Sequence, residues 1–115
     1  ILFRESGSGK LHSWGFQNGG VGETLRLYTY IWDSPTSANS LYTSNYYFQT
    51  APVVWLRIAD DGTNRTCWVS WDGKNFVKTW AVGRTSFLTA DEIGFFTSAT
   101  TNIAAGMSLL SWAET

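Results

Sequence analysis

Hydrophobic positions along the chain fall in short runs of β-branched and aromatic residues, separated by clusters of Gly, Asn, Asp and Ser. The 3.6-residue period of an amphipathic helix is almost absent, whereas such runs with turn residues between them are typical of an all-β fold. The pattern predicts eight strands, at about residues 1–5, 10–16, 23–32, 52–60, 65–71, 75–82, 92–97 and 106–113.

The clearest unit is a meander of three strands between residues 53 and 82. Asp61-Gly62 and Asp72-Gly73 separate its strands. An Asp-Gly pair between alternating runs is among the strongest hairpin signals, because glycine accepts a positive φ. Both alternating sets of side chains in residues 53–58 are largely apolar. Strands that are apolar on both faces are expected in a two-sheet sandwich or at an assembly contact.

Two segments depart from the strand pattern. Residues 33–51 are rich in Ser, Thr and Tyr and form the longest irregular stretch, which makes them the first choice for a functional loop. Thr89-Ala90-Asp91-Glu92 has the form of a capping box, which predicts one helical turn before the strand at 92–97.

Composition narrows the function classes. A chain of 115 residues suits a single domain, residues 1–115. Net charge is −1 and no basic run occurs, so nucleic-acid binding has no support. No apolar run approaches the length of about 18 residues that a membrane span needs. The chain opens with Ile1-Leu2-Phe3 as if in the middle of a strand, so we expect residues 1–115 to be one domain of a longer product.

Titratable residues give little sign of catalysis. The single histidine, His12, is expected at the surface or a sheet edge, and Cys67, the single cysteine, is expected to be a small buried hydrophobe. Neither a nucleophilic triad nor a metal site can be built from these two residues. We therefore predict no catalytic residue, no metal ligand and no cofactor.

Paired carboxylates, as in glycoside hydrolases, are the alternative to consider. The candidates all occur in turns, strands or at the predicted helical turn: Glu5, Glu23, Asp60, Asp61, Asp72, Asp91 and Glu92. Turns favour Asp for local hydrogen bonding, and helix starts favour acidic groups. The stretch "DDGTN" (60–64) could supply oxygens to calcium, but a turn is the favoured interpretation. In "SWDGKNF" (70–76), Asp72 is likewise interpreted as a turn residue.

Aromatic residues are the remaining signal. They make up 17% of the chain, with seven Trp and five Tyr, and Trp and Tyr serve both sugar stacking and protein interfaces. Most are expected in the core. Those near the irregular segment are the predicted ligand-binding residues, with one polar partner among them: Trp32, Tyr42, Asn45, Tyr46 and Tyr47.

Five stretches in order carry a family resemblance: "FRESGSGKL" (3–11), "WLRIADDGTN" (55–64), "SWDGKNF" (70–76), "RTSFLTADEIGFF" (84–96) and "SLLSW" (108–112). Together they resemble the concanavalin A-like jelly-roll domains of bacteriophage virion proteins and some bacterial surface proteins. The resemblance implies an antiparallel two-sheet β-sandwich. It also implies that a further strand precedes "FRES" in a complete domain. Glucanases of that family carry an E-x-D-x-x-E motif, which this chain lacks.

The function we predict is a non-catalytic module on a phage virion surface: a capsid decoration, a head fibre or a tail-associated domain. Its partners would be identical copies or other virion subunits, with weak adsorption to cell-surface glycans. The first alternative is a carbohydrate-binding module of a bacterial enzyme or adhesin, secreted or on the cell surface. A glycoside hydrolase is the least favoured.

Overall fold

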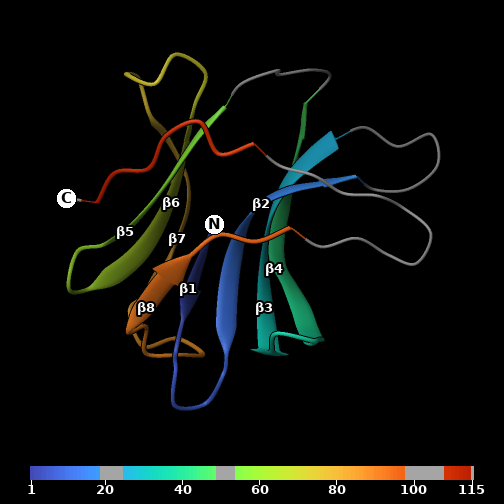
Figure 1. Cartoon of the computed structure of the whole chain (residues 1–115), viewed down its shortest axis with the longest axis vertical. Coiled ribbons are helices and arrows are strands. Elements are labelled where there is room, and N and C mark those ends of the chain that lie inside the picture. Colours follow the sequence, from blue (N-terminus) through green and yellow to red (C-terminus); the bar gives the residue numbers. More distant parts are fainter. Residues whose placement is uncertain (19–24, 49–53, 98–107, 115) are drawn as a thin grey trace.

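A five-stranded antiparallel sheet is the larger of two layers in the computed structural model, which describes residues 1–18, 25–48, 54–97 and 108–114. Its strand order is β4-β3-β2-β1-β8 (Figure 1). The bounds of these strands are β1 Leu2–Arg4, β2 Leu11–Asn18, β3 Leu25–Ser34, β4 Ser37–Phe48 and β8 Glu92–Gly94. The first four follow one another as a meander, and β8 returns from the far end of the chain to pair with β1.

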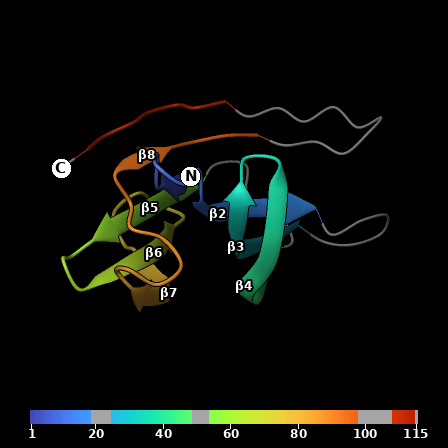
Figure 2. The ribbon, with the colours of Figure 1, turned by 90° about the horizontal axis from the view of Figure 1, so that it is seen from below.

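The second layer is the predicted meander, a three-stranded antiparallel sheet in the order β5-β6-β7. Its strands are β5 Trp55–Asp60, β6 Asn64–Ser70 and β7 Val77–Gly83. Both predicted hairpins are confirmed, and Gly62 and Gly73 have φ values of 87° and 71°. Figure 2 shows the two sheets as separate layers, with β5–β7 on one side of the view and β2–β4 on the other.

The core joins the two layers. Trp14 and Leu27 point from β2 and β3 toward Cys67 and Val69 of β6, and all four are almost fully buried. Leu56, Ile58 and Trp80 pack against this cluster from the three-stranded sheet. Because apolar side chains of both sheets meet in one cluster, the architecture is an all-β sandwich, as predicted.

Seven of the eight predicted strands overlap a strand of the structure, and the eighth does not. Residues 108–113 form no strand, although the sequence predicts one there. The irregular segment predicted at 33–51 is also wrong over most of its length, because β3 extends to Ser34 and β4 occupies Ser37–Phe48. A turn of two residues, Pro35 and Thr36, connects them.

The predicted helical turn at Thr89–Glu92 does not form, and no helix occurs in the described ranges. The capping-box residues bond elsewhere. The Thr89 amide donates to Glu5 Oε1 at 2.8 Å, and the Asp91 amide donates to the Arg4 carbonyl at 2.9 Å. These contacts draw the segment along the N-terminal strand, where Glu92 begins β8.

Candidate functional site

An aromatic row runs along the outer face of the five-stranded sheet. Leu27, Thr29 and Ile31 of β3 are buried on the core side. The intervening residues Tyr28, Tyr30 and Trp32 therefore face away from the core, since side chains alternate along a strand. Ring centroids lie 5.8 Å apart for Tyr28–Tyr30 and 5.4 Å apart for Tyr30–Trp32. The three rings, defined here as the aromatic row, make one continuous, partly exposed surface.

Trp32 is held in place at the end of the aromatic row. Its Nε1 donates a hydrogen bond to Ser13 Oγ on the neighbouring strand β2 at 2.8 Å, and Ser13 itself is buried. Phe96 meets the indole edge-on, with ring centroids 6.0 Å apart. Contacts from two sides fix the orientation of the indole, so a flat ligand would meet a ring that is already positioned.

A pocket of about 370 Å³ lies beside Trp32. This volume is near the lower end of the range, about 300–1,000 Å³, of small-molecule sites. Its walls are Leu2, Arg4, Leu11, Trp32, Pro35, Phe96 and Thr97. Arg4 Nη1 pairs with Glu92 Oε2 at 2.7 Å across β1 and β8. The pocket thus combines apolar walls with hydrogen-bonding groups at one side, which suits an uncharged amphipathic ligand.

Of the predicted binding residues, Trp32 lines this pocket. Tyr42, Asn45, Tyr46 and Tyr47 belong to β4 by their backbone, where Tyr46 pairs with Leu27 and Tyr47 with Arg26. Their side chains lie outside the described part of the structure. Four of the five predicted residues therefore belong to the edge strand β4 rather than to a loop, and Trp32 belongs to β3.

Sequence reasoning missed Tyr28, Tyr30 and Phe96. The signal for the first two was present, because "YTYIW" places aromatic residues at positions i, i+2 and i+4 of a predicted strand. That spacing puts all three rings on one face. Phe96 follows β8, a strand that reaches Trp32 only through the long-range pairing of β8 with β1.

The acidic residues of the described ranges hold turns and strand ends together. Asp72 accepts hydrogen bonds from the Lys74 and Asn75 amides, the Asn75 side chain and the Ser70 hydroxyl. These donors, the Asn75 amide foremost, hold the pKa of the Asp72 carboxyl far below its usual range. The predicted turn role of Asp72 is confirmed.

Asp61 and Glu5 have equivalent roles. Asp61 Oδ1 accepts hydrogen bonds from the amides of Asn64 and Thr63, and these lower its pKa, Asn64 more than Thr63. Glu5 accepts hydrogen bonds from the Ser8 hydroxyl and the Thr89 amide. Both bonds lower the pKa of Glu5, and the bond from Ser8 has the larger effect. Glu23 lies outside the described residues. No group of three or more metal-ligating side chains occurs in the ranges that the structure describes.

His12 is buried, so its predicted place at the surface or a sheet edge is wrong. It lies on the core side of β2, 1% exposed, with its ring stacked on Phe3 at 6.1 Å. Burial, and then the positive charge of Arg65, lower the pKa of His12 to about 3. An uncharged imidazole therefore fills this position at neutral pH.

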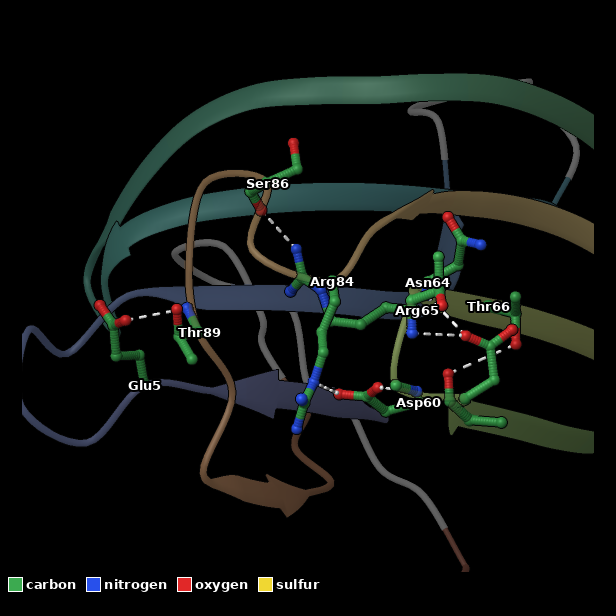
Figure 3. A network of polar contacts seen from close by, with 12 residues as sticks. Glu5, Asp60, Asn64, Arg65, Thr66, Arg84, Ser86 and Thr89 are labelled. Carbon is green, nitrogen blue, oxygen red and sulfur yellow. Dashed lines mark hydrogen bonds and ion pairs between the residues drawn. The ribbon is translucent and has the colours of Figure 1, made fainter.

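Arg65 is the buried cation beside His12. Its guanidinium lies 5.6 Å from the Phe3 ring centroid and donates to the Ser86 carbonyl (Figure 3). In the same view Arg84 reaches the Asp60 carboxylate, Nε to Oδ2 at 2.9 Å. The arginines thereby tie the segment after β7 back to β5 and β6. Cys67 is buried as predicted, and burial raises the pKa of its thiol to about 12.

The chain matches no protein-family model, and no curated protein and no solved structure is significantly similar to it. Within the described ranges, none of the chain forms a helix with the length and hydrophobicity of a membrane span.

Proposed function

We propose that the protein is a non-catalytic surface module that adsorbs neutral saccharides on the aromatic row. The observation that carries the proposal is the alignment of Tyr28, Tyr30 and Trp32 on one sheet face, next to the pocket at Trp32. Sugar rings have an apolar face of C–H groups, which packs against aromatic rings, and hydroxyl groups at their rim, which need hydrogen-bond partners. The aromatic row supplies the apolar contact, and Arg4 and Thr97 in the pocket wall supply the hydrogen-bond partners.

The site suits weak and repeated binding. The aromatic row is shallow, and Arg4, a charged residue of the pocket wall, is already paired with Glu92. A single module would then bind with a Kd on the order of 0.1–1 mM, or about 4–5.5 kcal/mol. Several copies on one particle would bind a glycan surface far more tightly through avidity. Such avidity fits a repeated virion component as well as it fits a bacterial adhesin.

The test is a neutral glycan array followed by calorimetric titration of any hit. Trp32→Ala should weaken binding at least about tenfold, since most of an aromatic side chain's contact is then lost. Trp71→Ala is the matched control, because Trp71 is 49% exposed and directly follows β6 of the other sheet. Absence of any neutral ligand, or equal binding by the Trp32→Ala variant, would contradict the proposal.

The second candidate is an assembly role in a phage virion, in the jelly-roll setting that the family resemblance implies. Exposed apolar side chains favour it: Phe95, Leu109, Leu110 and Trp112, with Leu110 73% exposed. Phe95 and Trp112 contact each other at 5.7 Å. Apolar groups gathered on a surface commonly mark contacts with another subunit. Light scattering that shows a monomer at all concentrations, with capsid and tail genes absent from the neighbourhood, would count against this role.

A further inference from the structure

The outer face of the three-stranded sheet carries a row of two cations around one tryptophan. Strand register places Arg57 of β5 opposite Trp68 of β6, and Trp68 opposite Lys78 of β7. The neighbouring residues Leu56, Ile58, Cys67 and Val69 point into the core, so this row points away from it. Arg57 Cζ lies 4.9 Å from the Trp68 ring centroid, and Lys78 Nζ lies 5.7 Å from it.

The guanidinium of Arg57 is positioned by two aromatic rings. Its Cζ lies 4.9 Å from the Phe76 centroid as well as from that of Trp68. Stacking against rings uses the faces of the guanidinium and leaves its N–H edge to meet a ligand. An arginine held in this way loses less conformational entropy when it binds a carboxylate in a two-point manner.

Within the described residues neither Arg57 nor Lys78 forms an ion pair, and the Asp61 carboxylate acts on Lys78 only at longer range. The two ion pairs found there join Arg4 to Glu92 and Arg84 to Asp60. Asp72, at the adjacent hairpin, uses its oxygens for the hairpin itself. Arg57 and Lys78 are both exposed, so an anion can approach from solvent.

Trp55 extends the row with a flat apolar surface. It lies two residues before Arg57 on the same face of β5 and is 38% exposed. A planar ring beside a fixed guanidinium matches a sugar ring that carries a carboxylate. We propose that this face is a second binding site, selective for acidic saccharides of the uronate type. Arg57 and Lys78 would bind the carboxylates, and Trp55 would stack on a ring.

A single-stranded nucleic acid is the competing ligand class, since it also combines negative charge with flat rings. Base stacking needs free aromatic faces, and the guanidinium already lies against Trp68 and Phe76. The site therefore offers one exposed indole, Trp55, for stacking and a fork of donors for carboxylates. This arrangement favours the uronate.

The test is calorimetric titration with tetragalacturonate and with the neutral tetrasaccharide of galactose. The acidic ligand should bind at least about tenfold more tightly, and its binding should weaken in 0.5 M NaCl because salt screens exposed charges. Arg57→Gln should lose about tenfold or more in affinity, and Arg57→Lys several-fold, because an ammonium lacks the planar fork. Lys74→Gln, which removes an exposed charge at the adjacent hairpin tip, should stay within about twofold.

Two results would overturn the proposal: equal affinity for acidic and neutral tetrasaccharides, or wild-type affinity in Arg57→Gln. Tighter binding of a thymidine 15-mer than of tetragalacturonate would assign the face to nucleic acid instead. Should Arg57→Gln fail to fold, Lys78→Gln at the exposed end of the row gives the same test. Trp32→Ala should leave uronate binding unchanged, so failure here is distinguishable from failure of the neutral site on the other sheet.

Discussion

The indole of Trp55 lies directly on Gly73, the glycine of the β6–β7 hairpin. A Cβ atom at Gly73 would come 2.9 Å from Trp55 Cε2 and 3.0 Å from its Nε1. The backbone of Gly73 also has a φ of 71°. Two separate requirements, a left-handed backbone and the absence of a side chain, therefore meet at this residue.

Alanine substitution at the two hairpin glycines should separate these requirements. Gly62 has a φ of 87° but open space around it, so Gly62→Ala should cost only backbone strain, about 1–2 kcal/mol. Gly73→Ala should cost about 1 kcal/mol more, because Trp55 must also move. Urea denaturation measures both losses. Gly7→Ala, with open space and no positive φ, should be nearly neutral, and equal losses at Gly62 and Gly73 would show that the Trp55 contact does not matter.

Asp72→Asn should remove a stability contribution that depends on pH. Hydrogen bonds from the Asn75 amide and then the Lys74 amide hold the pKa of Asp72 below its unfolded value. The carboxylate therefore contributes its full stabilisation above about pH 4, the ordinary aspartate range, and loses it as the pH falls toward the folded pKa. We expect the variant to be less stable at pH 7 and to approach the wild type progressively as the pH falls from about 4 toward 2. A difference that is constant over this range would argue against the carboxylate charge.

His12 should make the protein less stable in mild acid. Burial first, and Arg65 second, lower its folded pKa to about 3, whereas the unfolded imidazole titrates near pH 6.5. Between these values only the unfolded state takes up the proton, so stability declines as the pH falls from about 6.5, by at most ~1.4 kcal/mol per pH unit.

Replacement His12→Phe tests this assignment, because it keeps a flat ring against Phe3 and removes the titration. Denaturation midpoints at pH 7, 6, 5 and 4.5 give the comparison, in a window that lies above the titration of Asp72. The wild type should lose stability across this series, and the variant should lose much less. Parallel declines in the two proteins would exclude His12 as the source.

Cys67 should be inert in the folded protein. Its thiol is fully buried and burial raises its pKa to about 12, while thiol reagents need an accessible thiolate. An aromatic disulfide reagent should label the protein in urea at once, and the native protein only at the rate at which it opens. Immediate labelling of the native protein would mean that the two sheets do not close over β6.

The sequence predicts the two-sheet character well because most strands are short apolar runs with clear turn residues between them. It fails at β4, whose Ser, Asn and Thr residues look like a loop. Among the described strands, β4 lies at the edge of the sheet and pairs with β3 alone, with shifts in register. One side of an edge strand bonds with water, so polar residues are tolerated there.

The opposite failure occurs at residues 108–113, where an apolar pattern is not matched by strand pairing. The residue pattern of a segment indicates only its tendency to be extended. To form a β-strand, the segment also needs the edge of another strand to pair with. The candidate binding site could likewise be predicted only in part from the sequence. Trp32 was predictable from composition, but its contact with Phe96 and the pocket between them depend on β8 pairing with β1.

The uneven burial of the tryptophans has a practical consequence for spectroscopy. Trp14 is buried in the core and 1% exposed, whereas Trp71 and Trp112 are 49% and 41% exposed. The intrinsic fluorescence is therefore a sum of a blue-shifted, shielded emitter and red-shifted emitters open to small quenchers. Acrylamide should quench the outer indoles first and leave the signal of Trp14 and of partly buried indoles such as Trp80, so that closure of the two sheets can be followed in the native protein without an added label.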